Sequence, residues 1–114
     1  MSTDCIFCKI AAGEIPATKV YEDDQVVAFE DIQPVAPVHV LVIPRKHLAS
    51  VNDLHAGDSA LLGALFAAIQ RVAQEKGVAE SGYRVITNAG KDSGQAVFHL
   101  HFHVIGGRKL GPLA

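Results

Sequence analysis

The chain has almost no excess of either charge, and this lack of net charge limits the kinds of partner that it can bind. Its 114 residues carry ten Lys and Arg against twelve Asp and Glu, a formal net charge of −2. This balance offers no basic surface for a nucleic acid polymer or an anionic membrane, so a small ligand is favoured. No apolar run approaches the roughly 20 residues that span a bilayer, and residues 1–5 lack the basic stretch and apolar core of a signal peptide. We therefore expect a cytoplasmic protein.

Repeats, low-complexity tracts and linkers are also absent, so residues 1–114 are expected to form a single domain. Apolar residues at helical spacing predict a short helix over residues 4–12, and an apolar stripe predicts a long helix from a cap at Asp58 to residue 76. Strands are predicted at residues 20–22, 25–29, 38–43, 83–87 and about 97–105. Five strands with one long and one short helix indicate an α+β domain with an antiparallel sheet.

The most informative segment is the last predicted strand, which contains three alternating histidines, His99, His101 and His103. Side chains alternate between the faces of a strand, so the three imidazoles are expected on one face and Leu100 and Phe102 in the core. Besides a solvated face, two functional interpretations remain. Either the imidazoles bind a catalytic metal jointly, or one imidazole is a nucleophile and the others assist it electrostatically.

The loop directly before this strand favours phosphate chemistry. Residues 88–95 (Asn-Ala-Gly-Lys-Asp-Ser-Gly-Gln) are small and rich in backbone amides that can surround an anion, although the order of a Walker loop is absent. Such a loop is a weak signal alone. Next to a histidine nucleophile, it places phosphate donors where they are needed.

The only two cysteines, Cys5 and Cys8, form a C-x-x-C pair near the start of the chain. In a reducing compartment the pair is a metal site, a redox pair or two inert thiols. A thioredoxin-like redox pair follows a strand, and nothing before Cys5 can supply that strand.

Three segments occur in one order along most of the chain: residues 5–10 around the cysteines, residues 29–32 with 37–44, and residues 94–103 around the histidines. Together they resemble the histidine triad (HIT) family, specifically its Hint branch of nucleotide-binding proteins. The resemblance implies a HIT-like fold, with a five-stranded antiparallel sheet that continues across a homodimer into ten strands. It also implies hydrolysis of purine nucleoside phosphoramidates and aminoacyl adenylates through a covalent nucleotidyl-histidine.

The resemblance also implies a role for individual residues. His101 becomes the nucleophile, a neutral imidazole whose Nδ1–H is held by an acceptor such as a backbone carbonyl. His103 and His39 are expected to contact the phosphate oxygens or the leaving group, and Asp31 to accept both ribose hydroxyls. The remaining expected contacts are Asn88, Gly94, Gln95 and Ala96 at the phosphate, and Ile6, Phe7, Ile15, Phe29, Ile32 and Leu41 around the base.

Relatives with the cysteine pair bind a structural zinc ion, one per chain. Carried onto this sequence, the four ligands are Cys5, Cys8, His47 and His99. The resemblance implies that the reaction requires no catalytic metal. The chain departs from the family at Ala96, where some Hint relatives carry a serine that assists the leaving amine. It departs again in the short tail of residues 108–114, because relatives have a tail that reaches the neighbouring active site.

Two alternatives to the Hint-type hydrolase stay open. One is a dinucleoside polyphosphate hydrolase of a sister branch, although that branch has a glutamine shortly after the third histidine, where this chain has residues 104–107 (Val-Ile-Gly-Gly). The other is a purine-nucleotide-binding module that regulates a partner protein. His55 matches no motif and is expected on the surface.

Overall fold

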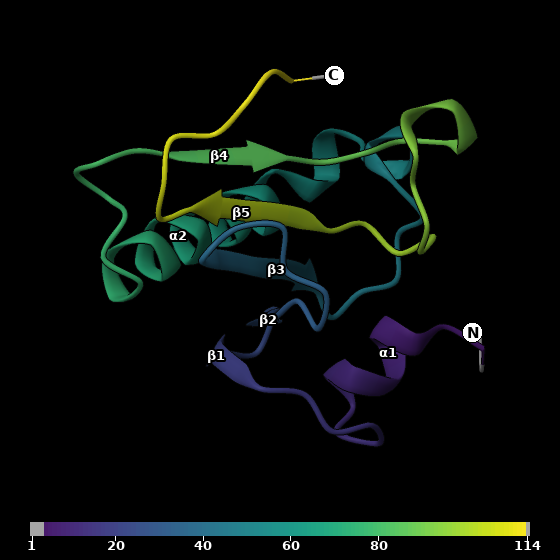
Figure 1. Ribbon diagram of the computed structural model, residues 1–114. Helices are drawn as coiled ribbons and strands as arrows, with labels where there is room; N and C mark the ends of the chain where they lie inside the picture. Colours follow the sequence, from purple (N-terminus) through teal and green to yellow (C-terminus); the bar gives the residue numbers. More distant parts are fainter. Residues whose placement is uncertain (1–3, 114) are drawn as a thin grey trace.

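The computed structural model describes residues 4–113 and contains one antiparallel sheet (Figure 1). Its strands are β1 (Lys19–Glu22), β2 (Val26–Glu30), β3 (Val38–Pro44), β4 (Tyr83–Ile86) and β5 (Phe102–Gly106). They lie in the order β1-β2-β3-β5-β4, and every neighbouring pair is antiparallel. The predicted five-stranded sheet with one short and one long helix, α1 (Ile6–Ala11) and α2 (Ser59–Glu75), is confirmed.

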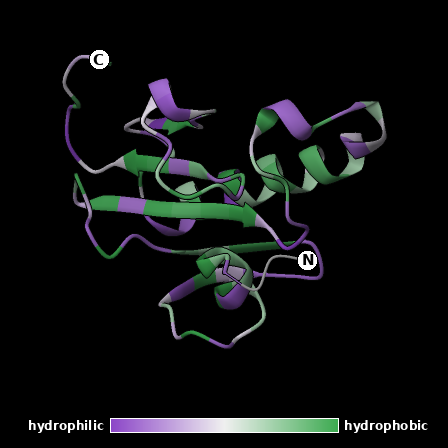
Figure 2. Ribbon diagram, turned by 90° about the vertical axis from the view of Figure 1, so that its right-hand side faces the viewer, coloured by the Kyte–Doolittle hydropathy of each residue, from purple (hydrophilic) through white to green (hydrophobic). Residues whose placement is uncertain are grey.

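The long helix α2 covers one face of the sheet. Its predicted apolar stripe, Leu61, Leu65, Ile69 and Val72, is buried against the sheet. Alternation along the central strands divides the side chains between two cores. Val40 and Val42 pack with α2, whereas Leu41 and Ile43 point to the opposite face. The strands are accordingly mostly hydrophobic along their length (Figure 2).

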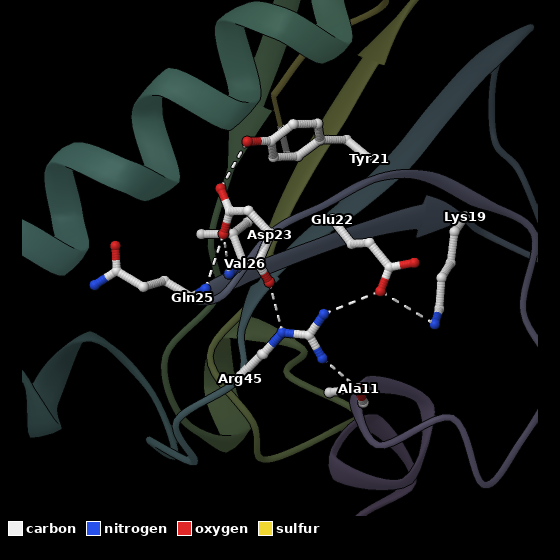
Figure 3. Close-up of polar contacts among 8 residues, drawn as sticks. All are labelled: Ala11, Lys19, Tyr21, Glu22, Asp23, Gln25, Val26 and Arg45. Atoms are coloured by element: carbon white, nitrogen blue, oxygen red, sulfur yellow. Dashed lines mark hydrogen bonds and ion pairs between the residues drawn. The ribbon is translucent and has the colours of Figure 1, made fainter.

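The short helix α1 packs on this opposite face, where Phe7, Ile10 and Ala11 are buried against β2 and β3. Arg45, directly after β3, holds the C-terminal end of the helix. Its guanidinium donates to the carbonyl of Ala11 at 2.6 Å and to the carbonyl of Asp23 at 2.7 Å, and pairs with Glu22 at 3.0 Å (Figure 3). One cation therefore ties α1 to the turn between β1 and β2.

The prediction of a strand from residue 97 is wrong, because β5 begins only at Phe102. Before this residue the backbone leaves the sheet ladder. The Leu100 N–H donates to the Leu48 carbonyl at 2.6 Å, outside the sheet, and the carbonyl of Pro44 accepts from the ring of His99 at 2.8 Å. His99 and His101 therefore lie in an extended segment that leads into the strand.

Asp58 stands at the N-cap of α2, as predicted, but its side chain makes no capping bond to the helix. Its carboxylate instead accepts from Lys46 Nζ at 3.0 Å and from the His55 N–H at 3.2 Å. His55 itself is exposed, as expected. Within residues 4–113, no helix combines the length and apolar character that crossing a membrane requires.

Candidate active site

A pocket of about 390 Å³ opens on the face of the sheet that carries α1. This volume lies within the range of small-molecule sites, and its wall is mainly apolar. Ile6 and Ile32 stand at its rim with 46% and 94% of their surface exposed, whereas Phe7 and Phe29 are buried and meet edge to face at 5.4 Å. The predicted nucleotide contacts that line the pocket are Ile6, Phe7, Ile15, Phe29, Asp31, Ile32, Leu41 and Ala96, together with His101 and His103.

All three histidines of the triad lie on this face, although only His103 belongs to a regular strand. The ring of Phe7 lies 6.0 Å from that of His99 and 5.1 Å from that of His101, and the rings of His101 and His103 are 5.0 Å apart. The intervening Leu100 and Phe102 belong to the core under α2. The predicted alternation is therefore present in the extended segment as well as in the strand.

The ring of His101 is held through Nδ1, which lies 2.7 Å from the carbonyl oxygen of His99. A carbonyl only accepts hydrogen bonds, so Nδ1 carries a proton, and in the neutral ring the lone pair is therefore on Nε2. This is the orientation that the family resemblance implies. The hydroxyl of Thr87, at the end of β4, donates to the carbonyl of His101 at 2.7 Å and holds the same residue from its backbone. His101 is therefore held at its ring and at its backbone where it lines the pocket.

His39 and His103 are joined by a hydrogen bond whose direction follows from their neighbours. The backbone N–H of Val35 donates to His39 Nδ1 at 3.2 Å, so this ring carries its own proton on Nε2. Nε2 lies 2.9 Å from His103 Nδ1 and donates to it. The proton of a neutral His103 is therefore on its Nε2. A hydrogen-bond chain runs from Val35 through both rings toward the pocket.

Burial keeps both of these imidazoles neutral. Desolvation is the main cause that lowers the pKa of His103, to about 4, and repulsion from His101 and His39 adds to it. Desolvation also lowers the pKa of His39, while the carboxylate of Asp31 opposes the shift. At neutral pH the two rings donate and accept hydrogen bonds without bringing a positive charge.

Asp31 lies beside this pair, with Oδ2 at 3.4 Å from His39 Nε2 and Oδ1 accepting the N–H of Gln33 at 2.8 Å. Together with the ligand atoms of His39 and His103 it forms a cluster within 4.8 Å that resembles a metal site. A metal on His39 Nε2 requires the proton on Nδ1, where it would face the N–H of Val35. The hydrogen bond from Val35 therefore does not suit a metal held by Asp31, His39 and His103.

The glycine-rich loop offers fewer phosphate donors than its sequence suggests. The N–H of Gly94 donates to Lys91, and the N–H of Gln95 donates to Gly90. The Gln95 side chain is buried and braces the loop, bonding the Gly90 N–H at 2.8 Å and the Ala49 carbonyl at 2.7 Å. Ala96 alone of the expected loop residues lines the pocket; Gly94, Gln95 and Asn88 lie outside its wall.

Behind the triad, four metal-ligating atoms lie within 4.8 Å of one another, from Cys5, Cys8, His47 and His99. The His99 Nδ1 is 3.3 Å from Cys5 Sγ, 3.5 Å from Cys8 Sγ and 3.2 Å from His47 Nδ1. A tetrahedral ion with bonds of about 2.0–2.3 Å places its ligand atoms roughly 3.3–3.8 Å apart. The spacing therefore suits a metal ion such as zinc.

The chemistry of this donor set agrees with the spacing. The buried His99 donates from Nε2 to the Pro44 carbonyl at 2.8 Å, so its Nδ1 lone pair faces the two thiols. Burial raises the pKa of the Cys8 thiol to about 11, and its contact with Cys5 adds to the shift. Without a metal this thiol keeps its proton, and a bound ion has to displace it.

Three supporting roles escaped prediction from the sequence. Thr87 and Arg45 act through carbonyl groups of residues distant in the chain, and no local pattern marks such partners. The bracing role of the Gln95 side chain depends on the loop's three-dimensional path. Nothing in the spacing of these residues could have identified them.

Comparison with known proteins places this geometry in a family. Residues 12–110 match the HIT domain model. The chain is 45% identical over 113 residues to the purine nucleoside phosphoramidase of Escherichia coli K12, covering 99% of this chain and 95% of the relative. A histidine triad protein from Clostridium difficile superimposes with a TM-score of 0.95 and 50% identity, covering 100% of this chain and 99% of the other. A HIT family hydrolase from Clostridium thermocellum gives 0.94 and 47%, covering 98% and 97%. The chain belongs to the HIT domain family.

Proposed function

We propose that this protein is a nucleotidyl hydrolase of the Hint type, which cleaves purine nucleoside phosphoramidates and aminoacyl adenylates. One observation carries the proposal. His101 is held through its Nδ1–H by the His99 carbonyl at 2.7 Å, and its ring lines an apolar pocket beside Ala96. A neutral, oriented imidazole in such a place is a nucleophile for phosphorus. The similarity to a purine nucleoside phosphoramidase supports this choice of substrate.

In the proposed reaction, the nucleoside enters the pocket with its base between Ile6, Phe7 and Phe29 and its ribose hydroxyls on Asp31. The Nε2 lone pair of His101 forms a bond to phosphorus while the bond to the leaving group breaks and its electron pair departs. A carboxylate leaves without a proton, whereas an amine leaves with a proton taken from solvent, and the water of the second step returns a proton to solvent. Water then attacks phosphorus, the bond to His101 breaks, and a nucleoside monophosphate is released.

His103 and His39 act on the leaving-group side. Because His39 donates to His103 Nδ1, the N–H of His103 is available to stabilise charge on the phosphate oxygens or to assist an amine. The Ala96 N–H is the loop amide that we assign to the phosphate. None of these steps requires a catalytic metal.

The test is hydrolysis of an adenosine phosphoramidate by the wild type and by His101→Ala. We expect the variant to lose turnover while it still binds AMP, and rapid quenching of the wild type to show a covalent nucleotidyl adduct by mass spectrometry. His55→Ala, which removes an exposed histidine outside the site, is the matched control and should keep full activity. Nucleotide binding without turnover in the wild type would favour the regulatory module.

We further propose that the cluster of Cys5, Cys8, His47 and His99 holds one structural zinc ion per chain. The ion would join α1 to the segment before β5 and supply no step of the reaction. Both thiols have to stay reduced to bind it, which supports a cytoplasmic location. Metal analysis of the purified protein should find about one zinc per chain.

We also propose a homodimer in which the β4 strands of two copies pair and make one ten-stranded sheet. β4 is an edge strand, and the unpaired backbone groups of an edge favour association with another strand. Two apolar side chains support this choice, because Val85 on β4 is 38% exposed and Phe66 on α2 is 48% exposed. Sedimentation should show a dimer that Val85→Glu weakens.

A further inference from the structure

His99 belongs to two sites at once. Its ring contributes Nδ1 to the metal-ligating cluster, at 3.3 Å from Cys5 Sγ and 3.2 Å from His47 Nδ1. Its backbone carbonyl, in the same residue, accepts the Nδ1–H of His101 at 2.7 Å. The acceptor that orients the nucleophile is therefore part of a candidate metal ligand.

The backbone at this point receives little support from the sheet. The pairing of β3 with β5 starts at Val42 and Phe102, so the His99 carbonyl lies outside the ladder. Two hydrogen bonds hold the segment, from the Leu100 N–H to the Leu48 carbonyl and from Thr87 to the His101 carbonyl. The first of them acts on the peptide unit that contains the His99 carbonyl, because the Leu100 N–H and this carbonyl lie in one plane. Both supports of that unit start from the metal-ligating cluster, since Leu48 directly follows His47 and the His99 ring is itself a member.

That ring is anchored at both of its nitrogens. Nε2 donates to the Pro44 carbonyl at 2.8 Å, and Nδ1 faces the cluster. Without an ion, Nδ1 faces two thiols and a second imidazole, which offer it only weak or alternative hydrogen bonds. With an ion, four bonds of fixed direction meet there.

We propose that the metal centre orients the nucleophile: His99 is a positioning residue that transmits ion binding to the tautomer and aim of His101 through its own carbonyl. This inference rests on the proposed function for the role of His101. It goes further because the bound ion then helps to orient His101 in addition to stabilising the fold, although no step of the reaction passes through the ion.

The fold allows this effect to be separated from general loss of structure. α1 carries both cysteines and also lines the nucleotide pocket, but its C-terminal end has an anchor of its own. Arg45 donates to the Ala11 carbonyl at 2.6 Å (Figure 3). Phe7 and Ile10 are buried. A metal-free chain is therefore expected to keep α1 docked and to keep binding AMP.

The experiment compares zinc-loaded wild type, wild type stripped by a chelator, the stripped protein refilled with zinc, and Cys8→Ser. Long-range proton–nitrogen NMR of the histidine rings reports the His101 tautomer directly, circular dichroism reports the fold, and calorimetry reports AMP binding. The single-turnover rate of nucleotidyl transfer is measured in parallel. Cys8→Asp, which can restore a fourth ligand, is the matched control for Cys8→Ser.

The loaded protein should show one His101 tautomer with the proton on Nδ1. The stripped protein and Cys8→Ser should show a mixture, with AMP binding changed less than about threefold and transfer slowed about 10- to 100-fold, as when the outer shell of a site is lost. Refilling and Cys8→Asp should restore the single tautomer. A stripped protein with an unchanged His101 spectrum overturns the inference, and so does a stripped chain that unfolds as a whole. If no form transfers a nucleotide, the proposed function fails, but the NMR comparison still decides the coupling.

Discussion

Replacing Asp31 by Asn separates the proposed ribose contact from the apolar contacts of the pocket. The side chain is 20% exposed at the pocket wall, and Oδ1 accepts the Gln33 N–H at 2.8 Å. Asn keeps an oxygen for this bond, so the loop should stay in place. It loses the charge, and its NH₂ group cannot accept a hydrogen bond from the second hydroxyl.

The size of the effect follows from the bond that is lost. A hydrogen bond to a charged group contributes about 1.5–3 kcal/mol, which corresponds to AMP binding about 10- to 150-fold weaker. Calorimetry with AMP and with 2′,3′-dideoxy-AMP isolates this term. Asp31→Asn should weaken AMP by this factor and the dideoxy nucleotide by less than about threefold, and Asp24→Asn, in the exposed turn after β1, should change neither.

The same variant tests the electrostatics of the site. The Asp31 carboxylate raises the pKa of both His39 and His103, so its removal should lower both further and shift the acid limb of the rate profile to lower pH. Equal loss of affinity for AMP and for the dideoxy nucleotide would refute the ribose assignment.

Four further outcomes follow from the structure. Leu65→Ala should lower the free energy of unfolding by about 2–5 kcal/mol in urea titration, because this fully buried side chain of α2 fills the main core; an effect below about 1 kcal/mol, half the lower end of that range, would contradict the packing. The pKa of His103 is lowered from the ordinary 6.5 to about 4, so between these values the unfolded chain binds a proton that the folded chain does not bind. The free energy of unfolding should therefore fall as the pH drops through this window, and His103→Gln should make that fall smaller. Cys8→Ser should lose zinc and lower the Tm while turnover is reduced but still measurable, which metal analysis and calorimetry will check. Ala96→Ser should raise turnover of an adenosine phosphoramidate by returning a hydroxyl beside the leaving amine, and an unchanged or lower rate would count against that account.

The sequence predicted the sheet, both helices and the stripe of α2 because these depend on local periodicity. Apolar spacing along α2 and alternation along β3 are visible in a short window, and burial then follows. The start of β5 was missed because alternation continues through His99 and His101, where the backbone is extended but unpaired. Side-chain direction has a period of two in any extended segment, whereas a strand also needs a partner.

For the site, the resemblance to the HIT family, carried by the order of the histidine and cysteine motifs, implied which residues would gather. His101, His103 and His39 do meet, and so do the four members of the metal cluster. Gly94 and Gln95 were predicted to offer amides to a phosphate, but their N–H groups already donate within the loop. A sequence lists the donors of a loop without showing which of them its own turns consume.

The amino-acid sequence by itself determined the elements, the core faces and the chemical groups of the site, because each of these depends on residue type and short-range spacing. Only the tertiary structure decided the protonation pattern. The carbonyl of His99 and the N–H of Val35 assign the protons of His101 and His39 from two and four residues away, and the carbonyl of Pro44 assigns that of His99 from a distant segment. The direction of a hydrogen bond depends on which groups meet in space, and that is settled only when the sheet and its loops are assembled.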